Sequence, residues 1–218
     1  MRKSLRWILP LTILALGDLT VGAAVSRADD KLVPEEGAIE VMLLRQPSVR
    51  EDLKLSHDEA SKIDNFTREQ WEKAKEISKL STEAERDKKF AEMSKENDRF
   101  VDKTLTKEQR QRLKEIEFQI AGLICLNRPE VAKKLNLTVE QSKRVKEMQK
   151  QIRQEMEELL YNSAPESRQA KADEIRKTSR AGILELLNDE QEKTWAQLQG
   201  RVFKGEIVFG KGKSAASN

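Results

Sequence analysis

The amino-acid sequence predicts an all-α protein that consists of two tandem helical units, each about 80 residues long, with long antiparallel helices. Charged residues make up 36% of the chain, and only 9 Gly and 5 Pro interrupt it. Apolar residues stand singly among the charged ones and recur at the 3.6-residue spacing of amphipathic helices. A helix-start signature also occurs four times with repeating spacings, which is typical of an internal duplication.

The signature is a Leu, then Ser, Thr or Asn, then any residue, then an acid, then Gln or Ala, and its first copy is one residue longer. Its four leucines are Leu55, Leu105, Leu137 and Leu187, so the spacings are 50, 32 and 50 positions. The signatures therefore recur as pairs, and the second pair follows the first by 82 positions. Shifting the chain by 82 also brings Pro47 onto Pro129, outside the signature. We therefore divide the chain into unit 1, residues 29–120, and unit 2, residues 121–203.

Each signature predicts the start of a helix. Its second residue can cap the helix by accepting a backbone N–H, and the residue three positions later can complete a capping box. The preceding Leu can pack against the first turn. The expected caps are Ser56, Thr106, Thr138 and Asn188, and the expected box partners are Glu59, Gln109, Gln141 and Gln191.

Within each unit we expect a short helical lead-in up to Pro47 or Pro129, a short turn of helix, two long helices, and a helix from the second signature. Ser81 and Ser163 are expected to cap the second long helices. Pro165 suits a first helical turn, and Gly200 marks the end of the last helix. Residues 204–218 are expected to form a disordered tail.

Residues 1–28 predict a secretory signal peptide. A basic start precedes an apolar run of about 10 residues, and small residues follow up to Ala28. A membrane anchor is the alternative, but a bilayer span needs about 20 apolar residues. The sequence thus predicts a periplasmic or secreted protein without stable membrane insertion once the signal is removed.

The charge of the expected mature chain excludes a general polyanion binder. Residues 1–28 hold four of the 41 basic residues and one of the 38 acidic ones, which leaves 37 of each. A formally neutral chain offers no net field for nucleic acid or anionic membranes. We expect no nucleic-acid partner and no cofactor.

Few residues could carry catalysis or bind a metal. His57, the only histidine, lies in the first turn of an expected helix and has no neighbouring groups that would complete a metal or acid–base site. Cys125, the only cysteine, lies in an apolar run and is expected to be buried, with an intermolecular disulfide as the alternative. The protein is therefore not expected to be an enzyme.

Aromatic residues are the remaining candidates for function. Most fall on expected apolar stripes, so we expect them to pack in the core. Phe66 and Trp71 are the candidates for a client-binding surface, because the residue 82 positions after Trp71 is Arg153 and an exposed Trp71 is therefore plausible.

Two signatures, Leu105-Thr106-Lys107-Glu108-Gln109 and Leu137-Thr138-Val139-Glu140-Gln141, fit the Leu-Thr-x-x-Gln motif of the Spy/CpxP family of small periplasmic helical proteins. The chain resembles this family chiefly over residues 105–148. The resemblance implies a thin, curved helical homodimer that shields unfolded clients, damps an envelope-stress sensor kinase or, in zinc-resistance relatives, binds metal. The duplication and the Pro-x-Val-x3-Leu-x-Leu lead-ins depart from that pattern and look more like exported bacterial proteins without an assigned function.

Two classes of function remain for this chain, and both involve binding to another protein. An ATP-independent chaperone or envelope-stress adaptor requires an exposed, concave apolar surface. A structural or scaffolding helical module with one fixed partner requires a closed core and a small interface. The exposure of Phe66, Trp71 and the methionines distinguishes them.

Replacing Thr138 with Ala should lower the free energy of unfolding by about 1 kcal/mol, because the helix start loses its cap. Chemical denaturation of the two proteins measures this difference. An unchanged denaturation midpoint would contradict the capping role.

Overall fold

The computed structural model describes residues 38–162 and 165–207 as an all-α fold, and these ranges contain ten helices and no strand. The predicted fold class is therefore confirmed. The helices are α1 (Ala38–Leu44), α2 (Pro47–Asp52), α3 (His57–Ser78), α4 (Glu83–Thr104), α5 (Lys107–Ala121), α6 (Leu123–Leu126), α7 (Pro129–Lys134), α8 (Val139–Asn162), α9 (Pro165–Leu186) and α10 (Asp189–Gln199).

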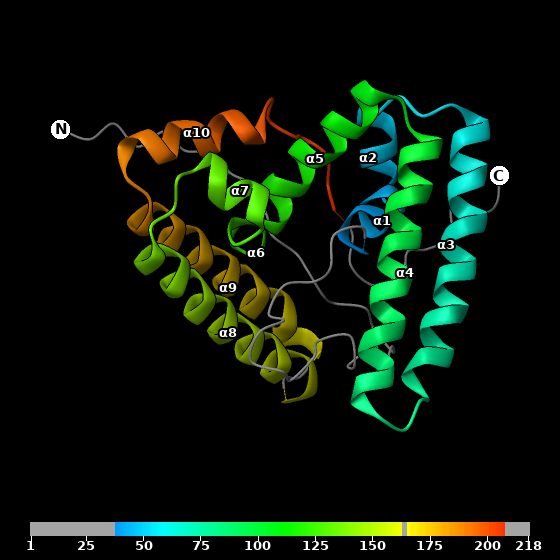
Figure 1. Ribbon diagram of the computed structural model, residues 1–218, viewed down its shortest axis with the longest axis horizontal. Helices are drawn as coiled ribbons and strands as arrows, with labels where there is room; N and C mark the ends of the chain where they lie inside the picture. Colours follow the sequence, from blue (N-terminus) through cyan, green and yellow to red (C-terminus); the bar gives the residue numbers. More distant parts are fainter. Residues whose placement is uncertain (1–37, 163–164, 208–218) are drawn as a thin grey trace.

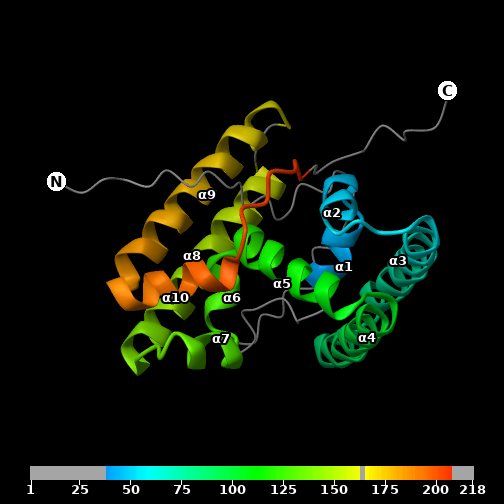
Figure 2. The ribbon, with the colours of Figure 1, turned by 90° about the horizontal axis from the view of Figure 1, so that it is seen from above.

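Two helical hairpins lie on opposite sides of a centre of short helices (Figures 1 and 2). One hairpin is α3 and α4, joined by residues 79–82, and the other is α8 and α9. Helices α1, α5 and α6 lie between them, and α10 packs against α5. The centre therefore connects two long arms.

Helix boundaries recur at the spacing read from the sequence. Helices α2 and α7 begin and end 82 positions apart, as do α4 and α9. The turn after the first pair also recurs, because Lys54 and Asn136 are the two non-glycine residues with positive φ among the described residues, at 54° and 49°. The chain therefore makes the same left-handed turn after α2 and after α7.

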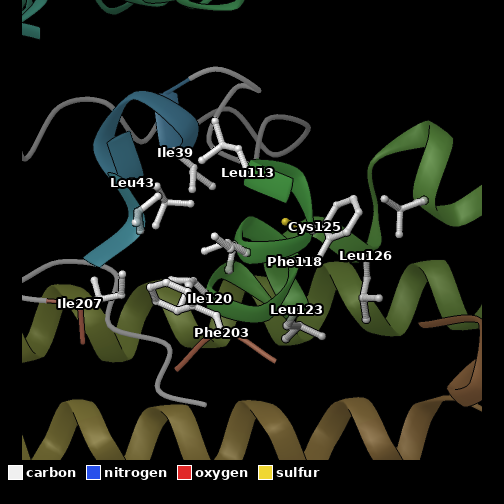
Figure 3. Packing of buried hydrophobic residues seen from close by; sticks show 14 of the residues in the cluster. Ile39, Leu43, Leu113, Phe118, Ile120, Leu123, Cys125, Leu126, Phe203 and Ile207 are labelled. Atoms are coloured by element: carbon white, nitrogen blue, oxygen red, sulfur yellow. The ribbon is translucent and has the colours of Figure 1, made fainter. Parts of the chain in front are cut away.

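The main core lies between α1, α5 and α6 and extends to the C-terminal segment (Figure 3). Leu44, Val49 and Ile63 from unit 1 are fully buried, and so are Leu126 and Val145 at equivalent positions of unit 2. Cys125 is also fully buried, as expected for a small apolar residue. The apolar stripes of both units thus contribute to one continuous cluster.

An ion pair is buried inside this core. Glu117 of α5 is 0% exposed and Arg128, just before α7, is 5% exposed. The guanidinium donates twice to the carboxylate, with Nη2–Oε1 and Nη1–Oε2 distances of 2.5 and 2.9 Å. Because both charges are removed from water, the pair is favourable only while both partners are present.

The C-terminal segment returns to unit 1. The Gln119 side chain donates to the carbonyl oxygens of Gln199 and Arg201 and accepts from the Phe203 N–H at 2.7 Å. Further along, the Ser48 hydroxyl donates to the Glu206 carbonyl at 2.5 Å. Residues 204–207, expected to be part of a disordered tail, therefore pack against α2, and Ile207 is buried. Residues 208–218 lie outside the described ranges.

Some predicted helix boundaries and caps are confirmed, and others are wrong or lie outside the described residues. Helix α9 begins at Pro165 and α10 ends before Gly200, as predicted. The cap of α4 is Thr82 and not Ser81, because the Thr82 hydroxyl accepts the Glu85 N–H. Ser163 and the expected signal peptide, residues 1–28, lie outside the described residues. Within the described residues, none of the helices combines the length and apolar character that crossing a bilayer requires.

Glu117→Gln should lower the free energy of unfolding by about 3–5 kcal/mol, because it leaves the Arg128 charge buried without its counterion. Glu96→Gln is the matched control, since it breaks the solvent-exposed Lys73–Glu96 pair and should cost less than about 1 kcal/mol. Denaturation of both variants measures the two costs. Equal small losses would contradict a strong coupling at Glu117.

Candidate functional site

The four signatures form four capping boxes at the starts of α3, α5, α8 and α10. In α8, the Thr138 hydroxyl accepts the Gln141 N–H at 3.1 Å, and the Gln141 side chain accepts the Thr138 N–H at 3.0 Å. The same reciprocal pair joins Ser56 to Glu59, Thr106 to Gln109, and Asn188 to Gln191. Each box satisfies backbone N–H groups that have no partner within the helix.

The signatures also meet in pairs, a contact that was not predicted from the sequence. The carboxamides of Gln141 and Gln191 exchange two hydrogen bonds of 2.7 and 2.9 Å, and Gln141 donates as well to the Leu186 carbonyl at 2.9 Å. In unit 1, the Gln109 carboxamide donates to the Leu53 carbonyl at 3.5 Å and is near enough to Glu59 to lower the pKa of its carboxylate. The signal that could have revealed this contact was the equal spacing of the paired signatures in the two units.

The Glu59 carboxylate is stabilised in its charged form. A hydrogen bond from the Ser56 backbone N–H is the main cause that lowers the pKa of Glu59 below its ordinary value of 4.5, and the Ser56 hydroxyl and Gln109 side chain lower it further. Partial burial acts in the opposite direction and is outweighed. The first capping box is thus a carboxylate version of the three Gln boxes.

The two aromatic candidates lie on α3 and are both half-buried. Phe66 stacks face to face on Phe100 of α4, with ring centroids 3.7 Å apart and planes 2° apart, and packs on the main core. The Lys75 ammonium lies 5.5 Å from the centre of the Trp71 ring. Phe66 therefore belongs to the base of the hairpin, whereas Trp71 marks its outer part.

The outer part of the α3–α4 hairpin, residues 70–94, is called here the distal arm. Its turn lies at the far end of the hairpin from α2 (Figure 1). The residues buried in and beside this arm are small or polar, namely Gln70, Ala74, Ser94 and Asn97. Its large apolar residues are all half-buried, namely Trp71, Ile77, Leu80, Phe90 and Met93. Two helices alone do not enclose these side chains.

A charged depression of about 1080 Å³ borders the start of α5. At its centre, Arg112 donates to both Asp52 oxygens at 2.7 and 3.2 Å, to Glu115 at 3.0 Å and to the Arg201 carbonyl at 2.6 Å. Burial disfavours the Arg112 charge, but the hydrogen bonds to Asp52 and Glu115 outweigh it and raise the pKa of Arg112. These groups are hydrogen-bonded to one another, so the side chains that line the depression connect α2, α5 and residue 201.

The acidic side chains and the single histidine do not form a metal site within the described residues. His57 is exposed in the first turn of α3. Among the described residues, no group of three or more His, Cys, Asp or Glu side chains is placed to hold a metal ion. The arrangement can cap helices, join segments that are distant in the sequence, and present half-exposed apolar side chains on the distal arm.

No protein-family model matches this chain, and neither a curated protein nor a solved structure shows significant similarity to it. The resemblance to the Spy/CpxP family therefore remains a prediction from the Leu-Thr-x-x-Gln signatures.

The capping box of α3 should make stability depend on pH. Because the pKa of Glu59 is lower in the folded chain than in the unfolded chain, its contribution is fully present above the unfolded value and is lost as the pH falls through the folded value. Glu59→Gln, which introduces the residue found in the other three boxes, should therefore be less stable than the wild type at pH 7, with a gap that closes below about pH 4.5.

Denaturation midpoints between pH 7 and pH 3 measure this gap, and Glu69→Gln on the same helix is the control. A gap that stays constant across this pH range would show that the Glu59 charge does not stabilise the fold.

Proposed function

We propose that this chain is a non-catalytic, exported helical module that binds one fixed protein partner along the distal arm. The half-buried state of the large apolar residues of this arm, Trp71, Ile77, Leu80, Phe90 and Met93, is the observation that carries the proposal. A partner helix laid along α3 and α4 would cover part of this apolar surface and complete a three-helix packing. Export rests on residues 1–28, which lie outside the described ranges.

The interior of the distal arm supports a role in binding and not only in folding. Where the two helices face each other, Gln70, Ser94 and Asn97 occupy positions that aliphatic residues would fill in a self-sufficient hairpin. The Asn97 Oδ1 atom is buried and accepts no hydrogen bond from the described residues. The arm therefore obtains little stability from its own interior, so an added apolar surface would stabilise it.

A single fixed partner fits this surface better than many unfolded clients. The large apolar residues of the arm are only half-exposed, and Val139 and Leu184 are the only exposed large apolar residues in the described part of the chain, both far from the arm in sequence. A chaperone for unfolded chains needs a larger continuous apolar patch. The chaperone or stress-adaptor role is the second candidate, supported by the same half-buried apolar residues and by the Leu-Thr-x-x-Gln signatures.

The decisive variant carries Trp71→Arg and Phe90→Ala, which are the residues found 82 positions later in unit 2. Cross-linking in an envelope extract, followed by quantitative mass spectrometry, should enrich one partner with the wild type and lose it with this variant. Val139→His, which introduces the equivalent residue of unit 1 away from the arm, should retain the partner.

Light scattering with an unfolding model client and no ATP separates the two candidates. The fixed-partner proposal predicts no suppression of aggregation at a large molar excess. Suppression near stoichiometric amounts that the Trp71→Arg/Phe90→Ala variant loses would instead establish the chaperone role.

A further inference from the structure

One end of the molecule carries an unusual distribution of charge. It is formed by α7, the start of α8, the end of α9 and the start of α10, on the side opposite the α3–α4 hairpin (Figures 1 and 2). Five cations are exposed on α7 and α8, and none of them forms an ion pair within the described part of the chain. They are Lys133, Lys134, Lys143, Arg144 and Lys146.

Acidic residues lie beside these cations on α9 and α10. Glu185, Asp189 and Glu190 are exposed, and Glu192 is partly exposed. The ion pair that Glu190 forms is a solvated one with Lys193 on its own helix, at 3.6 Å. Glu140 and Glu147 are also exposed on the same part of α8, and Lys193 on α10, which leaves net charges of +3 and −3. The two groups therefore form adjacent surfaces of opposite net charge, which together we call the end face.

Unit 1 does not need this charge to build the same helices. The residues 82 positions before the five cations are Glu51, Asp52, Ser61, Lys62 and Asp64, with a net charge of −2 in place of +5. The residues before the acidic group are Lys103, Lys107, Glu108 and Arg110, with a net charge of +2 in place of −4.

The acids of unit 1 are also used internally. Asp52 accepts from Arg112 and Asp64 pairs with Arg50 at 2.5 Å. Because equivalent helices form with opposite surface charges, the charges of the end face are not required by the fold.

Exposed apolar residues lie on the same end face. Val139 is 89% exposed and Leu184 is 53% exposed, and the equivalent residues of unit 1 are the polar His57 and Asp102. Val139 precedes Lys143 by four residues and Lys146 by seven, so the three share one face of α8. Unit 2 thus combines new charge with new apolar surface at one place.

We propose that the end face binds a second copy of this chain about a two-fold axis. In an isologous contact, the basic surface of each copy faces the acidic surface of the other, and the exposed Val139 and Leu184 lie between them. A membrane or nucleic acid would be attracted by the cations but repelled by the four neighbouring acids. A second copy presents an acidic surface to the cations and a basic surface to the acids, so both groups of charges face opposite charges.

Charge reversals taken from unit 1 test this contact without disturbing the helices. The first variant carries Lys133→Glu and Lys146→Asp, and the second carries Glu185→Lys and Asp189→Lys; each new residue is the one found 82 positions earlier. Sedimentation equilibrium of the wild type at low salt should give a dimer that dissociates as salt is raised. Each variant alone should raise the dissociation constant by about tenfold or more.

Mixing the two variants should restore a dimer, because both contacts then join opposite charges, and one chain with all four substitutions should dimerise as well. Lys103→Glu with Lys107→Asp, the reverse exchange in unit 1, should leave the dimer intact. Circular dichroism verifies that each variant is folded.

A wild type that stays a single copy at low salt, or variants whose mixture does not associate, would overturn the proposal. Binding of a single-copy protein to phosphatidylglycerol vesicles would equally overturn it and assign the cations to an anionic surface. Neither result depends on the distal arm, so the partner proposed for α3 and α4 is tested separately.

Discussion

Helix α5 is buried on every side over residues 116–121, and this constraint organises the molecule. Burial removes the polar side chains of Arg112, Glu117 and Gln119 from water, so each must find its hydrogen bonds within the protein. Each finds them in a different segment: Arg112 bonds α2, Glu117 bonds the residue before α7, and Gln119 bonds the chain after α10. The polar groups of one helix thereby fix the positions of elements that are far apart in the sequence.

The features that the sequence predicted are those decided by local interactions. A capping box needs only residues three positions apart, so the starts of α3, α5, α8 and α10 could be recognised directly. Ser81 and Thr82 are both good caps, and only the geometry of the turn selects Thr82. Glu117 and Arg128 could not be identified, because among so many charged residues they resemble any solvated pair. Burial is decided by tertiary packing, and the periodic pattern did not mark α5 as a central helix.

The two units keep their backbone and core positions but differ at the surface. Lys54 and Asn136 adopt the same left-handed turn, and Ile63 and Val145 are both fully buried. Core positions must conserve shape and polarity, because each lost contact or buried charge costs stability. Exposed positions can change without such a cost, so the two units can differ most at their surfaces. The distal arm of unit 1 and the end face of unit 2 are two such differences, and they leave each unit with a separate surface.

The return of residues 199–207 to unit 1 has a consequence for the order of folding. The contacts of Asp52 with Arg201 and of Ser48 with Glu206 join residues separated by 149 and 158 positions. Unit 1 therefore lacks part of its core, including Phe203 and Ile207, until residues 199–207 have left the ribosome, although its own helices are synthesised first. Contacts of such long sequence separation slow folding. The core of unit 1 therefore stays incomplete during most of synthesis, because it closes around a segment that is synthesised about 150 residues later.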